Sequence, residues 1–211
     1  MPILLIWGDD IAASEREIEA LIKVKIDQAW SSINLTRLDG DDIIQAEQAL
    51  EEARTPPFGN GSRLIILKKS PFCNGCSGEL GKKFEDLLEV IPENTYLILN
   101  NLNKPDSRLR TTKSLQKLIK TKKAMEKNFR LPAVWDENGQ IKLIKQTANE
   151  LNLNVDDDAI LLIVEAIGNN SERLVSELKK LAIYTERNEQ TDNSAKNTLS
   201  ITKETVKELI Q

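Results

Sequence analysis

The sequence contains no histidine among its 211 residues. This absence excludes histidine-based triads, histidine general acid–base catalysis and histidine-ligated metal sites. Long hydrophobic runs are missing too, because the longest apolar segments, such as Ile3–Trp7 and the residues around Leu161–Val164, have only five or six residues. A membrane-spanning helix needs about 20, and the N-terminus has no basic region or cleavage site typical of a signal peptide. We therefore expect a cytoplasmic protein that does not contact a membrane.

Cysteine is scarce as well. Cys73 and Cys76 form a single C-x-x-C, and two sulfur atoms without histidine or a second pair cannot complete a tetrahedral zinc site within one chain. The same spacing occurs in thiol oxidoreductases, where the pair follows a strand and precedes a helix, as it does here. The neighbouring Gly75, Gly78 and Gly81 instead indicate a flexible loop. We favour unpaired loop cysteines, with a thiol oxidoreductase, or a metal shared between chains, as alternatives.

Basic and acidic residues are unevenly distributed. The whole chain carries a net charge of −4, but the range 104–130 has ten basic residues against two acidic ones, which gives +8 there and leaves −12 for the rest. A basic segment on an acidic body favours contact with phosphates or with an acidic partner, although a solvated helix face looks the same. A nucleic-acid-binding module is therefore an alternative function, and its candidate contacts are Arg108, Arg110, Lys113 and Lys117.

Short apolar segments alternate with helical patterns over the first 130 residues. Between these segments, apolar residues recur every three or four positions, which is typical of helices. Parallel strands require such crossover connections, so the pattern predicts an α/β fold with a mostly parallel five-stranded sheet flanked by helices. The expected strands cover residues 3–7, 33–38, 63–68, 95–100 and 124–129.

The pattern changes near Pro132, after which we predict no strand. Apolar residues at helical spacing indicate three helices, and a polar stretch over 186–200 precedes a short helix that begins around Thr202. We therefore expect two domains, an α/β domain over 1–138 and a small all-helical domain over 139–211.

Capping residues mark the expected helix starts. Ser14 with Glu17 would begin the first helix, and Asn169 with Glu172 would begin the third helix after Pro132. Acidic clusters also stand at helix starts, where their charge complements the helix dipole. We interpret these clusters as caps, since no nucleophile–base combination accompanies them; they are residues 9–10, 41–42 and 156–158.

The turn after the first strand occupies the place of a nucleotide-binding loop. Such a loop needs several glycines whose N–H groups surround the phosphates, followed by Lys and Ser or Thr. Between Gly8 and Ser14 there is no second glycine and no Lys-Ser/Thr pair, and Asp9 and Asp10 would repel phosphates. No later strand ends in paired acidic residues. We expect neither nucleotide hydrolysis nor a cofactor.

Three segments occur in the order found in one known family. The first is Gly8-Asp9-Asp10, the second is ARTPPF at 53–58 ahead of a strand that begins Arg63-Leu64, and the third runs from Gly168 to Tyr184 and contains ELKKL. In these segments the chain resembles the delta subunits of the bacterial DNA polymerase III clamp loader, which are non-hydrolysing members of the AAA+ class. It departs from them in Asn170-Ser171, where Asp-Leu is usual.

The resemblance implies an AAA+-like α/β domain without a P-loop, a helical lid domain and a third, collar domain. The collar domain is missing from this sequence, so we expect a fragment. The implied role is in DNA replication, as a subunit of a DNA-directed DNA polymerase holoenzyme. The subunit would have no catalytic site of its own and would be part of a nucleotidyltransferase only through membership of that complex. The implied partners are the sliding clamp (beta subunit) and the gamma/tau and delta prime subunits. Contact with DNA, the alternative that the basic segment suggests, is compatible with this role.

The resemblance also implies a clamp-binding tip. Phe58 follows two prolines and precedes Gly59, so we expect its ring at an exposed corner between a helix and a strand. Pro57 would stiffen this tip, and Thr55 and Pro56 would flank it. The ring is expected to fill a hydrophobic pocket on the clamp and so to favour the open form of the clamp ring.

Overall fold

The computed structural model describes residues 2–189 and 200–210. The chain divides into two compact units, Met1–Arg130 and Leu131–Gln211, which are described separately here. The division falls after Arg130, whereas the sequence pattern placed a domain boundary after residue 138. Residues 131–136 precede the first helix of the second unit. Of the polar stretch expected over 186–200, residues 190–199 lie outside the described residues.

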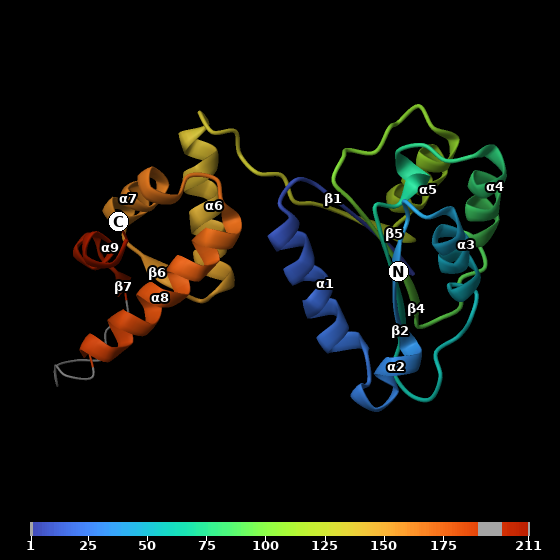
Figure 1. Ribbon diagram of the computed structural model, residues 1–211, viewed down its shortest axis with the longest axis horizontal. Coiled ribbons are helices and arrows are strands. Elements are labelled where there is room, and N and C mark those ends of the chain that lie inside the picture. Colours follow the sequence, from blue (N-terminus) through green and yellow to red (C-terminus); the bar gives the residue numbers. More distant parts are fainter. Residues whose placement is uncertain (1, 190–199, 211) are drawn as a thin grey trace. The chain divides into compact units, whose positions relative to one another are not determined.

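A five-stranded, all-parallel sheet forms the centre of the first unit (Figure 1), in the order β2-β3-β4-β1-β5. The predicted α/β fold class is therefore confirmed. Four strands start at the predicted residues, and only β2 starts later than expected. The strands are β1 (Ile3–Trp7), β2 (Leu35–Asp39), β3 (Arg63–Lys68), β4 (Thr95–Asn101) and β5 (Ala124–Asn128).

Helices cover both faces of this sheet. On one face, α3 (Ile43–Glu52), α4 (Gly78–Leu87) and α5 (Arg110–Lys120) pack their apolar sides against strand residues such as Leu97 and Leu99. On the other face lies α1 (Ile11–Lys25) (Figure 1). Its buried Ile18 belongs to the same apolar cluster as Ile98 of β4. Because alternate residues of each central strand face opposite layers, strands buried on both sides are apolar throughout.

The connections of the first unit include three short helical segments. η1 (Gln28–Trp30) and α2 (Ser31–Asn34) lie between α1 and β2, and η2 (Pro71–Cys73) lies between β3 and α4. The pair η1 and α2 matters for the candidate site, because it stands beside the connection from α3 to β3.

Two predicted helix caps are shifted. The N-cap of α1 is Asp10, whose carboxylate accepts from the Ala13 N–H at 2.9 Å, and Ser14 lies inside the helix. Helix α8 is capped by Asn170, which accepts from the Arg173 N–H at 2.9 Å, rather than by Asn169. In α1 the cap is an aspartate that precedes the predicted serine, and in α8 the cap is the asparagine that follows the predicted one. The capping-box pattern therefore misplaced both helix starts. The interpretation of the acidic clusters as caps is confirmed for Asp10 and Asp42, whose carboxylates accept from N–H groups of the first turns of α1 and α3. Asp156 stands at the N-cap position of its helix but forms no cap hydrogen bond, because its carboxylate accepts from the Ser200 hydroxyl at 2.6 Å.

The second unit is mainly helical. Its helices are α6 (Glu137–Glu150), α7 (Asp157–Ile167), α8 (Ser171–Glu189) and α9 (Lys203–Leu209), which enclose a separate apolar core. The structure adds a parallel pair of two-residue strands, β6 (Asn154–Val155) and β7 (Ser200–Ile201), that the sequence analysis did not predict. Two residues are too short to show a strand periodicity. Within residues 2–189 and 200–210, none of the helices has the length and apolar character that crossing a membrane requires.

Candidate functional site

The connection between α3 and β3, residues 53–62, forms a corner whose ends are buried and whose middle is exposed. Thr55 and Pro56 are exposed in it, Pro57 is half-buried, and Phe58 is 53% exposed. The predicted exposure of the Phe58 ring is therefore confirmed. An aromatic side chain that leaves half of its surface in water, next to a proline of fixed φ, is a candidate anchor for a partner protein.

Asn34 holds the backbone of this corner at Phe58. The Asn34 side chain is fully buried; its Nδ2 donates to the Phe58 carbonyl oxygen at 2.9 Å, and its Oδ1 accepts from the Phe58 N–H at 2.8 Å. The two hydrogen bonds satisfy both backbone polar groups of Phe58 and fix the residue at two points. Sequence reasoning missed Asn34, because no local pattern marks an asparagine that pairs with a residue 24 positions away.

Trp30 packs against the same corner. Its indole and the Phe58 ring are arranged edge to face, with centroids 4.7 Å apart and an interplanar angle of 71°. Gly59 has a φ of +67°, and a Cβ there would lie 2.5 Å from Nε1 of Trp30. A glycine is thus required at 59 both for its backbone conformation and for the close approach of the indole. Trp30 was not among the predicted site residues either.

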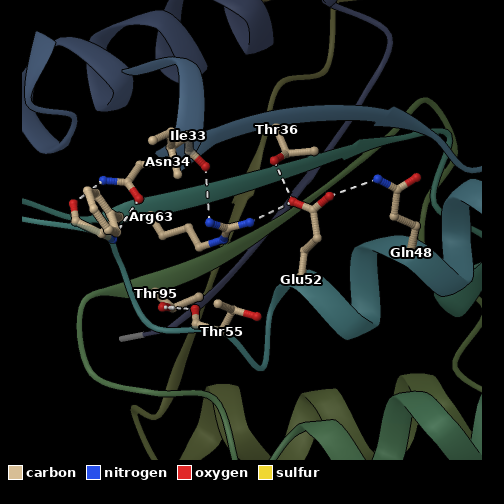
Figure 2. A network of polar contacts seen from close by, with 9 residues as sticks. Ile33, Asn34, Thr36, Gln48, Glu52, Thr55, Arg63 and Thr95 are labelled. Atoms are coloured by element: carbon tan, nitrogen blue, oxygen red, sulfur yellow. Dashed lines mark hydrogen bonds and ion pairs between the residues drawn. The ribbon is translucent and has the colours of Figure 1, made fainter. Parts of the chain in front are cut away.

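An ion pair lies beneath the corner (Figure 2). The Nη2 atom of Arg63 is 2.9 Å from Oε2 of Glu52, and its Nη1 atom donates to the Ile33 carbonyl oxygen at 3.0 Å. The two side chains are only 12% and 21% exposed. Thr36 and Gln48 also donate to the Glu52 carboxylate. The network joins the end of α3 to α2, β2 and the first residue of β3. The corner therefore connects α3 and β3, which are held together by this ion pair.

The carboxylate of Glu52 stays ionised in this setting. Burial raises the pKa of Glu52, but the hydrogen bonds from Thr36 and Gln48 and the charge of Arg63 outweigh burial, and the net pKa lies below its ordinary value. A further bond fixes the first part of the corner: the Thr95 hydroxyl donates to the Thr55 carbonyl oxygen at 2.9 Å (Figure 2).

The turn after β1 is closed by the protein's own backbone. The N–H groups of Gly8 and Asp10 donate to the carbonyl oxygens of Asn101 and Phe129, each at 3.0 Å. A Cβ at Gly8 would lie 1.9 Å from the Phe129 carbonyl oxygen, so this glycine permits close packing of two backbone segments. N–H groups that a phosphate-binding loop would offer to its ligand are engaged within the protein here.

The four basic candidates fall into two groups. The Arg108 guanidinium donates to both oxygens of the Asp106 carboxylate, from Nε at 3.0 and 3.2 Å and from Nη2 at 2.7 Å, and these hydrogen bonds lower the pKa of Asp106 to about 2. Arg110 is paired with Glu85 at 2.7 Å. Lys113 and Lys117 are exposed on α5 and form no ion pair with any residue of the described ranges.

The cysteines have raised pKa values. Both thiols are free, and burial raises the pKa of Cys73 to about 11 and also that of Cys76. Thiol–disulfide exchange requires a thiolate, which a raised pKa disfavours. Cys76 lines an open crevice of about 700 Å³. Across residues 2–189 and 200–210, no three cysteine, aspartate or glutamate side chains gather closely enough to hold a metal ion.

Residues 4–126, more than half of the chain, match the model of the family described as "DNA polymerase III, delta subunit". The solved structure of the Bacillus subtilis DNA clamp loader delta protein (YqeN) superposes with a TM-score of 0.78 at 19% sequence identity. The match covers 99% of this chain and 58% of that protein, so the chain spans less than two thirds of its length. No curated protein matches the sequence.

Two Thermotoga maritima structures are more distant. The RuvB Holliday junction branch migration motor gives a TM-score of 0.45 at 9% identity, covering 98% of this chain and 60% of its own. A DNA polymerase III gamma subunit-related protein gives a TM-score of 0.46 at 17% identity, covering 88% and 56%.

Proposed function

Since the chain belongs to the family of DNA polymerase III delta subunits, we propose that it is a clamp-loader subunit of DNA replication that binds the sliding clamp through Phe58. The observation that carries this proposal is the half-exposed Phe58 ring on a backbone fixed by Asn34. An apolar side chain held in water by its own backbone contacts is ready to fill a pocket on a partner without further ordering. Thr55, Pro56 and Pro57 form the rest of the contact.

The proposed action on the clamp requires no bond chemistry. A closed ring is in equilibrium with an open form, and a partner that binds the open form more tightly shifts the population towards it. The delta subunit would supply this difference in affinity, and the ATP-binding gamma/tau subunits, together with delta prime, would control when the corner is accessible.

This subunit itself would not hydrolyse ATP. The N–H groups of Gly8 and Asp10 are bonded to backbone carbonyls, and the turn has no lysine to reach a phosphate. The subunit would therefore belong to a nucleotidyltransferase complex without contributing a catalytic residue.

Complex formation with the sliding clamp of the same organism tests the proposal. Size-exclusion chromatography of a mixture should give an earlier peak that contains both proteins, with and without ATP. A parallel assay of phosphate release by the chain alone should stay at the buffer rate. Separate elution of chain and clamp at micromolar concentrations, or ATP turnover by the chain, would contradict the proposal.

DNA contact is a second candidate function, favoured by two exposed lysines of α5 that form no ion pair within the described residues. Lys113 and Lys117 are one helical turn apart, so their ammonium groups lie on one face and can reach successive phosphates. Arg108 and Arg110 are less suited, because each must first leave a carboxylate. Such contact is compatible with the proposed clamp-loader role.

A further inference from the structure

We infer that Asn34 is a positioning residue, which presets the Phe58 ring for binding while touching no partner itself. The inference rests on the proposed function of Phe58 and concerns how the anchor is kept ready. Asn34 is the last residue of α2 and has no exposed surface. Both polar atoms of its side-chain amide form hydrogen bonds with the backbone of Phe58. Its effect on a partner must therefore act through Phe58.

The corner needs such a restraint on one side only. Pro57 has its φ fixed by its ring, which limits the chain before Phe58. After Phe58 the chain continues with Gly59 and, two residues later, Gly61, both at positive φ. Glycines are the most mobile residues of an unbound loop. The two hydrogen bonds with Asn34 restrain the backbone at Phe58, directly before the glycines, as Pro57 restrains the residue before Phe58.

Helix α2 is itself anchored at the corner. The Ile33 carbonyl oxygen accepts from Nη1 of Arg63, which begins β3 directly after the corner (Figure 2). Two consecutive residues of α2 thus hold the corner at two places, Asn34 at Phe58 in its middle and Ile33 at Arg63 directly after its end. The edge-to-face contact of Trp30 with the Phe58 ring, 4.7 Å between centroids, limits the ring as well. Backbone and ring are both restrained before any partner arrives.

A purely structural role for Asn34 makes a different prediction. In that case Asn34→Ala would lower stability, and any loss of clamp affinity would be the same whether or not a ring is present at 58. A positioning role requires that the loss depend on the ring, because an alanine at 58 leaves nothing to position. A double-mutant cycle with Phe58→Ala separates the two roles.

The experiment measures clamp affinity by calorimetry for the wild-type chain, Asn34→Ala, Phe58→Ala and the double variant. We expect Asn34→Ala to weaken binding about 10-fold, since the binding step must then order one backbone residue and one side chain. In the Phe58→Ala background the same change should alter affinity less than 2-fold. Gln140→Ala is the matched control, because Gln140 is also buried and donates its amide to backbone carbonyls, of Ala133 and Val134, but belongs to the second unit.

Hydrogen exchange gives a readout without the clamp. The Phe58 N–H should exchange faster in Asn34→Ala, while the amides of β3 keep their protection. If Asn34→Ala does not fold, Asn34→Asp replaces it: the carboxylate still accepts from the Phe58 N–H but faces the Phe58 carbonyl with an oxygen, and a similar loss is expected. Wild-type affinity in the Asn34 variants, or an equal loss with and without the ring, would overturn this inference alone. Absence of binding by the wild-type chain would instead refute the proposed function, and the inference with it.

Discussion

Replacing Phe58 by Ala perturbs the proposed clamp contact directly, and its size follows from exposure. A phenylalanine side chain can bury roughly 200 Å². Because the residue is 53% exposed, about 100 Å² remains for a partner to cover. At about 25 cal/mol per Å² this area contributes about 2.5 kcal/mol to binding, which corresponds to a roughly 60-fold weaker complex for Phe58→Ala.

Titration calorimetry against the clamp measures this loss. Ile44→Ala is the matched control, because Ile44 is 76% exposed but lies in the first turn of α3, at the end of that helix away from the corner. Its affinity should stay within 2-fold of wild type. Phe58→Ala also loses the contact with Trp30, about 0.5–1.5 kcal/mol, so thermal unfolding must show that the variant is folded at the titration temperature. A Phe58→Ala chain that binds within 3-fold of wild type, or an equal loss in Ile44→Ala, would refute the assignment.

Three further predictions concern the corner, the basic face and the thiols. Gly59→Ala should lower the free energy of unfolding by about 1–3 kcal/mol, because it strains a positive φ and displaces Trp30. Gly78→Ala, at a position with open space and no positive φ, should leave it unchanged, and urea unfolding of both variants measures the difference. Changing Lys113 and Lys117 together to Gln should reduce the slope of log K for duplex DNA against log salt by about 2, and an unchanged slope would remove these lysines from any phosphate contact. Between pH 7 and 9 Cys73 should resist alkylation in the folded chain, since its pKa of about 11 leaves almost no thiolate; rapid modification at pH 8, measured by mass spectrometry, would contradict the burial argument.

Much of the fold was predictable because it depends on local patterns. The run Ile3–Trp7 is apolar throughout, as a strand covered on both faces must be, and its bounds agree with the structure. β2 was predicted to start at residue 33 because Ile33 is apolar, but Ile33 and Asn34 belong to α2 and the strand begins at Leu35. The side-chain pattern of two residues cannot distinguish the end of a helix from the start of a strand. The pair β6 and β7 has no periodicity at all.

Only the exposed part of the candidate site, the turn around Phe58, was predictable from the sequence. Pro57 and Gly59 flank Phe58, and both favour a turn, so the exposure of the ring could be inferred from sequence. The buried half could not, because Asn34 and Trp30 reach the corner from another part of the chain. Their roles come from tertiary packing, and an asparagine at the end of a short helix has many local explanations that involve no distant residue.

The corner lies away from the edge of the sheet at which ligands bind in this class of fold. In open parallel α/β sheets, ligands bind at the carboxyl ends of the strands, and at that edge the Gly8 turn is filled by the protein's own backbone. The corner stands at the opposite edge, directly before Arg63 and bonded to Thr95, the first residues of β3 and β4. A preformed apolar anchor needs no titrating group and no water-excluded cleft; it needs a rigid support, which paired strand starts and the Arg63–Glu52 ion pair provide. Binding free energy that differs between two states of a partner is then sufficient to shift that partner's equilibrium.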